Sequence, residues 1–307
     1  MTQFLYDVII YHRNCSDGSC GYWVARRYLN ENNKIHQAFA MHAGETLEIA
    51  INEFTNKSIA FIDVCPNFEY IQTLSKIAKD ITILDHHASS VSVIESVRDS
   101  DILNVRFEFD IKLSGCQLAW NHFYSKDIPS PWFLDYIADR DLWKFELDNS
   151  KEINAALHHK NLLNVESMDM IVCYNMDEIQ TLIELGRVII NIADKSLYSA
   201  LRECVEGTFL VNDVKYNVWF GTIERSARSN FGNKMTEKKM SNGKLPDFVV
   251  VYSYQPKTGM WFISLRGSND CPDLSTISKY FGGGGHKKAA GFEHKNPFDT
   301  IFNTRSN

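Results

Sequence analysis

Short apolar, β-branched runs alternate with segments of helical spacing along the first half of the chain. The runs at residues 4–11, 35–41, 58–64 and 81–84 are predicted to be buried strands, and residues 22–30 and 68–79 have the spacing of helices. This alternation predicts an α/β fold whose N-terminal sheet is mainly parallel and doubly wound, with helices on both faces. Ligands bind at the carboxyl ends of the strands in such sheets, so polar residues there become candidates for a site.

The second half of the chain changes character. Helical spacing at residues 114–124 and 132–141 is followed by an apolar periodicity from 176 to about 206, which predicts one long connecting helix. Strands are predicted at 208–211, 216–220, 247–252 and 260–265, with a helix at 274–281. The segment 230–246, rich in Lys, Asn and Gly, is predicted to be an exposed loop. We therefore expect domains at 1–150 and 207–307, the second a smaller α/β domain, joined by a helical connector at 151–206.

Composition narrows the class of protein. The 307 residues suffice for roughly two domains, and no apolar run approaches the ~20 residues of a membrane span. The N-terminus lacks the features of a signal peptide, and the seven cysteines include no Cys-x-x-Cys pair. We expect a cytoplasmic protein with reduced thiols and no membrane partner.

Charge is unevenly spread along the chain. Residues 206–307 hold 14 basic and 9 acidic residues, whereas residues 1–205 hold 18 and 29. An acidic part beside a basic part fits a cation-binding domain and an anion-binding domain. Chance asymmetry on solvated faces is the alternative.

Metal-binding side chains follow the predicted strands. His12 and Asp17 lie just after the first strand, Asp63 ends the third, and Asp85-His86-His87 follows the run at 81–84. Carboxylate and imidazole are ligands that suit Mn²⁺ or Mg²⁺. Helix capping by the aspartates and surface placement of the histidines are the structural alternatives. Asp139 and Asp141 offer further carboxylates, unless they are solvated helix charges.

Anion-binding features gather near the C-terminus. Arg266 ends a predicted strand, and its guanidinium fork matches a phosphate group. His286 is preceded by a run of bare backbone N–H groups and followed by two lysines. The residues of this run taken as candidates are Gly283, Gly284 and Gly285. A flexible turn is the alternative reading of the glycines.

The motifs, in this order, resemble the DHH phosphoesterase superfamily in its form with a C-terminal DHH-associated domain, which carries the sequence Gly-Gly-Gly-Gly-His. The resemblance covers nearly the whole chain and implies two Mn²⁺ ions, or Mg²⁺ or another divalent metal, between a catalytic domain at 1–150 and a substrate-binding domain at 207–307. It implies the metal ligands His12, Asp17, Asp63, His86 and Asp139. His87, Asp63 and Asp139 become catalytic residues, and Arg266, Gly283, Gly284, Gly285 and His286 become contacts to the substrate.

By this resemblance the chain is expected to be a phosphohydrolase that cleaves phosphodiester bonds in short oligonucleotides or small cyclic or bisphosphorylated nucleotides. A net charge of −6 disfavours generic binding of long nucleic acid. Cys15 stands where the family usually has an aspartate, so the resemblance implies that the metal at His12 is loosely bound, is of a different identity, or is completed by Asp141. A single-strand exonuclease and a non-catalytic nucleotide sensor with a degraded metal site are the alternatives, and a homodimer is left open.

Overall fold

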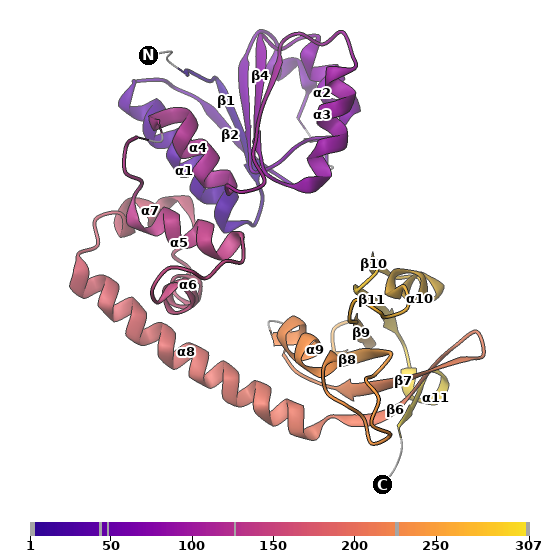
Figure 1. Ribbon diagram of the computed structural model, residues 1–307. Coiled ribbons are helices and arrows are strands. Elements are labelled where there is room, and N and C mark those ends of the chain that lie inside the picture. The colour runs from indigo at the N-terminus through magenta and orange to yellow at the C-terminus, as the bar shows by residue number, and fades with distance from the viewer. Residues whose placement is uncertain (1–3, 43–44, 48, 126, 225–226, 305–307) are drawn as a thin grey trace. The chain divides into compact units, whose positions relative to one another are not determined.

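The computed structural model describes residues 4–42, 45–47, 49–125, 127–224 and 227–304. The chain divides into two compact units, Met1–Ile189 and Ile190–Asn307, and Figure 1 shows the elements of each. The predicted roles of the segments 1–150, 151–206 and 207–307 remain predictions.

The first unit is built on a five-stranded parallel sheet of order β2-β1-β3-β4-β5. Its strands are β1 (Val8–His12), β2 (Gln37–Met41), β3 (Ser58–Ile62), β4 (Asp80–Asp85) and β5 (Val105–Phe109). Helices α1 (Ser16–Glu31) and α4 (Gly115–Tyr124) cover one face, and α2 (Phe68–Ser75) and α3 (Val91–Arg98) cover the other (Figure 1). The doubly wound α/β fold is therefore confirmed.

Each face of this sheet has its own core. Ile9 and Ile62 pack toward Trp23 of α1, whereas Ile10 and Phe61 pack toward Ile71 of α2. Period-two alternation sends successive side chains to opposite faces, and both faces are buried, so β3 is apolar along nearly its whole length. Strand β5 was not predicted, because it is an edge strand with the half-exposed sequence VRFEF.

Further helices complete the first unit. They are α5 (Trp132–Asp141), α6 (Ser150–His159), α7 (Val165–Ile171) and the first half of α8 (Met176–Glu203), with short 3-10 turns at Ile51–Phe54 and Ala88–Ser90. Ile153 of α6, Met168 of α7 and Leu182 of α8 are buried in the same core as Trp23. No helix in the described ranges is both long and apolar enough to cross a membrane.

The second unit is a seven-stranded sheet of order β10-β11-β9-β8-β7-β6-β12, antiparallel except for the pair β7–β8. The strands are β6 (Val205–Val211), β7 (Val214–Gly221), β8 (Phe248–Gln255), β9 (Met260–Arg266), β10 (Gly284–His286), β11 (Ala289–His294) and β12 (Phe302–Thr304). Its helices are α9 (Arg228–Thr236), α10 (Leu274–Tyr280) and α11 (Pro297–Thr300). Helices α9 and α10 pack into different cores of this unit.

Two local predictions were wrong. The first part of the supposed loop at 230–246 is helix α9, because Phe231 and Met235, one turn apart, are buried against the sheet despite their polar neighbours. Helix α1 begins at Ser16 and not near residue 22, so Asp17 lies in its first turn. This second correction matters for the site, because it fixes where the Asp17 carboxylate can reach.

Candidate metal centre

Asp63 lies at the centre of a cluster of titratable side chains at the carboxyl end of the parallel sheet. It directly follows β3, and its side chain is 1% exposed. Its backbone has φ 60°, a left-handed conformation that Asp tolerates better than most residues. One carboxylate oxygen, Oδ2, lies 3.2 Å from His12 Nδ1, and the other, Oδ1, lies 3.2 Å from His86 Nε2.

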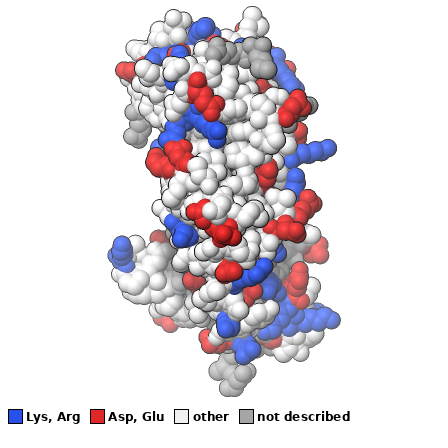
Figure 2. All heavy atoms as spheres, turned by 90° about the vertical axis from the view of Figure 1, so that its left-hand side faces the viewer, with Lys and Arg blue, Asp and Glu red and all other residues white. Residues whose placement is uncertain are grey.

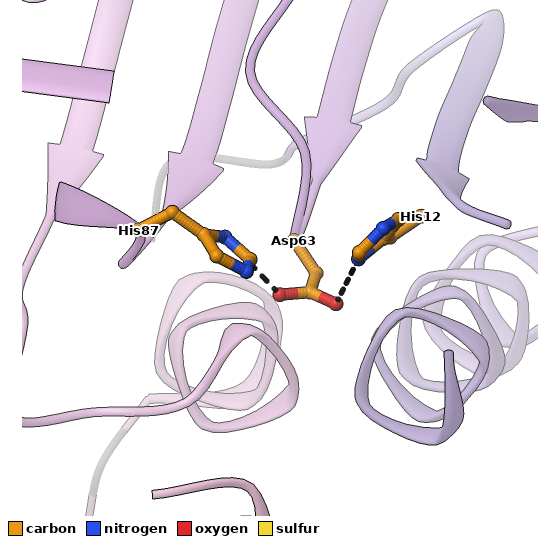
Figure 3. Close-up of side chains that lie close together, drawn as sticks. All are labelled: His12, Asp63 and His87. Atoms are coloured by element: carbon orange, nitrogen blue, oxygen red, sulfur yellow. Dashed lines mark hydrogen bonds and ion pairs between the residues drawn. The ribbon is translucent and has the colours of Figure 1, made fainter. Parts of the chain in front are cut away.

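Two groups of potential metal donors share this carboxylate. His12, Asp63 and His87 each offer a donor atom within 4.8 Å of the others, and so do Asp17, Asp63 and His86. Figure 3 shows the rings of His12 and His87 on either side of Asp63. The three strands β1, β3 and β4 end at one edge of the sheet, which is why residues so far apart in sequence meet here.

Residues in the first turns of α1 and α4 pack against the cluster and bond to it. The buried Asp17 carboxylate accepts N–H groups from Gly115 at 2.5 Å and Cys116 at 3.0 Å, and its Oδ2 lies 3.8 Å from His86 Nε2. A Cβ atom on Gly115 would lie 2.4 Å from the Asp63 Cβ atom, and one on Gly18 would lie 2.7 Å from the His12 Cβ atom. Glycine at both places therefore lets the helices approach Asp63 and His12 closely.

The electrostatics of the cluster favour a bound cation. Burial raises the pKa of Asp17, and the nearby charges of Asp63 and Asp141 raise it further. Burial also raises the pKa of Asp141, with Asp63 again adding to the effect. For Asp63, burial acts in the same direction, but hydrogen bonds from His12 and His86 outweigh it and hold its pKa well below the usual range. Three carboxylates crowd one site, and a divalent ion would relieve their repulsion.

Asp85 holds the ring of His87. Its Oδ1 lies 2.7 Å from His87 Nδ1, while Ser90 Oγ donates to its other oxygen. This hydrogen bond raises the pKa of His87 from 6.5 to about 9 in the metal-free protein, although burial acts the other way. A cavity of about 310 Å³ opens beside this pair. It is lined by Val64, Cys65, Pro66, Asn67, Asp85, His87, Ser89, Ser90 and Val93.

Asp139 and Asp141 differ in what they contact. Neither group of donors found among the described residues contains Asp139, whose carboxylate instead accepts the backbone N–H groups of Glu146 at 3.0 Å and Leu147 at 3.4 Å. Asp141, two residues further along the helix, has its Oδ2 atom 3.5 Å from His86 Nε2. The carboxylate of α5 that faces the cluster is thus Asp141.

Cys15 lies at the N-terminus of α1, and its thiol is not part of either donor group within the described residues. Burial raises its pKa, and the nearby charge of Asp63 raises it further. Without a metal, Cys15 is therefore a neutral thiol beside the cluster.

In the second unit, Arg266 ends β9 as predicted, half-buried beside α9. Its guanidinium donates to Ser264 Oγ at 2.8 Å, to the Leu265 carbonyl at 2.9 Å and to Ser229 Oγ at 3.2 Å. Burial lowers its pKa from the usual arginine value, which still leaves it charged near neutral pH. A Cβ atom on Gly232 of α9 would lie 2.5 Å from Arg266 Cγ, so the helix fixes the side chain sterically.

Part of the glycine run, residues 282–285, makes structural contacts within the second unit. The N–H groups of Gly282 and Gly283 bond to the carbonyls of Lys279 and Ser278 at the end of α10. A Cβ atom on Gly283 would lie 2.2 Å from the Gly291 carbonyl oxygen. Gly284–His286 then pairs with β11, which leaves Gly284, Gly285 and His286 exposed at the sheet edge. The proposed anion-binding role of the run remains a prediction.

Comparison with known proteins gives distant matches. No family model matches the chain. Uncharacterized protein R106 of Acanthamoeba polyphaga mimivirus is 25% identical over 298 residues, covering 93% of this chain and 66% of that protein, so the chain spans just under two thirds of its relative's length.

Solved structures are matched over most of the chain. They include an exonuclease RecJ bound to manganese (TM-score 0.49, 12% identity, 96% of this chain and 87% of that one). A pGpG-specific phosphodiesterase, PggH from Vibrio cholerae, has a TM-score of 0.46 at 12% identity, covering 95% and 93% of the two chains. An exopolyphosphatase-related protein from Bacteroides fragilis has a TM-score of 0.47 at 15% identity, covering 94% and 86%. At this level of similarity the function has to be argued from the site.

Proposed function

We propose that the protein is a metal-dependent phosphohydrolase of the DHH phosphoesterase type, which cleaves phosphodiester bonds in short oligonucleotides or small nucleotides. The observation that carries the proposal is the pair of donor groups that share the buried Asp63 carboxylate. A carboxylate shared between two sets of imidazole and carboxylate donors is the arrangement that two neighbouring divalent ions require.

The donor set fits Mn²⁺ or Mg²⁺. It contains carboxylates and imidazoles, which suit these ions, and neither group includes the softer Cys15 thiol among the residues described. His12 and His87 would bind one ion, Asp17 and His86 the other, with Asp63 shared. Bound ions would supply an activated water and a counter-charge for the phosphoryl oxygens. Asp141 is the carboxylate placed to complete the His86 side.

The chain's own residues supply orientation and charge. Asp85 fixes the His87 ring through Nδ1, and so sets which ring atom can meet a ligand or a phosphate oxygen. Arg266, held by two serine hydroxyls and by Gly232, is proposed to bind a phosphate of the substrate. His286 and the exposed glycines beside it are proposed to contact the same substrate.

Small substrates are favoured over long strands. On the face drawn in Figure 2, acidic and basic side chains of the described residues are both present and largely interspersed. A protein with net charge −6 also gains little from counterion release on a long polyanion.

The test is hydrolysis by metal-stripped protein with Mn²⁺, Mg²⁺ or Zn²⁺ added back. The panel contains RNA and DNA of two to five nucleotides, cyclic dinucleotides, a 3′,5′-bisphosphonucleotide and a ~30-nucleotide single strand. We expect turnover of the short substrates with Mn²⁺. Progressive, salt-sensitive shortening of the long strand would identify an exonuclease instead. Nucleotide binding without turnover under any metal would identify a sensor and refute the proposal.

A further inference from the structure

The loop between α5 and α6 displays an aromatic pair that the proposed chemistry does not use. Trp143 is 77% exposed, and it is the one exposed tryptophan of the six, all of which lie in the described ranges. Its ring contacts that of Phe145 edge-on, with centroids 5.0 Å apart. The Lys151 ammonium lies 5.3 Å from the centre of the Phe145 ring. A large apolar ring held in water beside lysines is unusual for a residue with only a packing role.

This loop is held in a strained conformation. Trp143 and Phe145 have φ values of 56° and 53°, a left-handed region that aromatic residues rarely adopt. Backbone strain of this kind persists only where surrounding contacts enforce it, and it gathers at functional sites. An ordinary surface turn could place glycine or asparagine at such positions at lower cost.

Hydrogen bonds to Asp139 hold the loop in this strained conformation. Its carboxylate accepts the N–H groups of Glu146 and Leu147, and its backbone carbonyl accepts those of Lys144 at 2.9 Å and Phe145 at 3.4 Å. The loop therefore wraps around one buried aspartate. This explains why Asp139 is buried yet belongs to neither donor group found in the described residues.

The aromatic pair also lies close to the candidate metal centre. Asp141, which lies 3.5 Å from His86, is only two residues before Trp143, so their Cα atoms are at most about 7 Å apart. Lysines flank the same loop, since the Lys144 ammonium donates to the Lys112 carbonyl at 3.5 Å and Lys151 faces Phe145. Aromatic rings interspersed with cations form the kind of surface on which nucleobases stack while phosphates meet the charges.

We propose that Trp143 and Phe145 form a stacking platform for a nucleobase of the substrate, with Asp139 as the residue that positions it. This inference rests on the proposed function and deepens it. The substrate class becomes nucleotidyl phosphodiesters rather than base-free phosphates. Since every base has a stacking face, the preference among bases is weak.

The kinetic test compares a dinucleotide with the same sugar–phosphate chain lacking one base. For Trp143→Ala, the ratio of kcat/KM for the dinucleotide to that for the abasic analogue should fall on the order of ten-fold, and Trp143→Phe should restore most of it. Leu103→Ala, at a position 94% exposed, is the matched surface control and should keep the ratio. An unchanged ratio in Trp143→Ala would overturn the platform.

A binding readout separates this inference from the proposed hydrolysis. The dinucleotide should quench the tryptophan fluorescence of the full chain and protect it from acrylamide, and Trp143→Phe should remove that signal. A Trp143 already protected without nucleotide, or unaffected by it, would overturn the platform. If the wild type hydrolyses no panel substrate, the proposed function fails, while fluorescence still decides whether a base stacks here.

Asp139 has its own discriminating measurement. As a positioning residue, Asp139→Asn should lower the same selectivity ratio and leave the number of bound Mn²⁺ ions unchanged. Loss of one ion with an unchanged ratio would make Asp139 a metal ligand, as the family resemblance implied, and would overturn its positioning role.

Discussion

Gly115 offers a way to disturb the metal centre without removing any chemical group from it. A Cβ atom at this position would lie 2.4 Å from Asp63 Cβ and 2.9 Å from Asp63 Cγ, whereas ordinary contacts begin at 3.4 Å. Asp63 or the start of α4 must therefore shift by about 1 Å in Gly115→Ala. A misplacement of about 1 Å in a catalytic site can cost about 10²-fold in rate.

Stability should change much less than activity. Overpacking a buried site costs about 1–3 kcal/mol, and replacing glycine by alanine within a helix returns roughly 0.5–1 kcal/mol. Gly186→Ala is the matched control, because its Cβ atom would lie 2.0 Å from the Glu152 carbonyl oxygen, where α8 meets α6, and its nearest contacts are all with Glu152. The Gly186→Ala variant should lose at least as much free energy of unfolding as Gly115→Ala, measured by urea denaturation of the metal-free protein.

The decisive comparison is between the two variants. Gly115→Ala should weaken Mn²⁺ binding in calorimetry and lower kcat/KM for the best panel substrate about 10²-fold, whereas Gly186→Ala should retain both. If Gly115→Ala is destabilised like the control yet keeps its Mn²⁺ affinity and activity within about twofold, the close approach of α4 to Asp63 does not position the metal centre.

Three further outcomes follow from the structure. Protonated His87 stabilises the metal-free fold through its hydrogen bond to Asp85, which raises its pKa from 6.5 to about 9. This contribution is fully present below pH 6.5 and is lost as pH rises through about 9. Between these pH values, the wild type should therefore lose more free energy of unfolding in urea denaturation than Asp85→Asn. An equal loss in both proteins would contradict the Asp85–His87 interaction. Gly232→Ala should displace Arg266 and raise KM for nucleotides about ten-fold with little change in kcat, and an unchanged KM would argue against Arg266 as a phosphate contact. Mn²⁺ at 100 times its Kd should stabilise the first unit by about 2.7 kcal/mol for each ion bound, which a shift of the urea midpoint would report, and no shift would mean that the folded centre does not bind the ion selectively.

Much of the side-chain cluster around Asp63 could be anticipated from the sequence, for a topological reason. His12, Asp63 and His86 each follow an apolar run, and the carboxyl ends of parallel strands meet at one edge of a sheet. The pattern of buried runs was enough to predict that edge, and the structure brings these three side chains within hydrogen-bonding distance.

What the sequence could not resolve depends on tertiary packing. Asp139 and Asp141 differ by two positions on one helix, so only the rotation of α5 and the path of the following loop decide which carboxylate faces His86. Helix α9 was missed because Phe231 and Met235 are scattered among polar residues, and burial against the sheet overrides the weak local signal. The strained conformation of Trp143 could be recognised only from its backbone φ angle in the structure.

The most direct test of the account is the number of Mn²⁺ ions bound per chain, measured by calorimetry and electron paramagnetic resonance on wild type and Asp63→Asn. Asparagine keeps the size of the side chain and tolerates its left-handed backbone, but it removes the shared charge. We predict two ions on the wild type, and binding of both sharply weakened in the variant together with loss of hydrolysis. A wild type that binds no ion, or a variant that keeps two ions and full turnover, would contradict the central claim that Asp63 joins two metal sites.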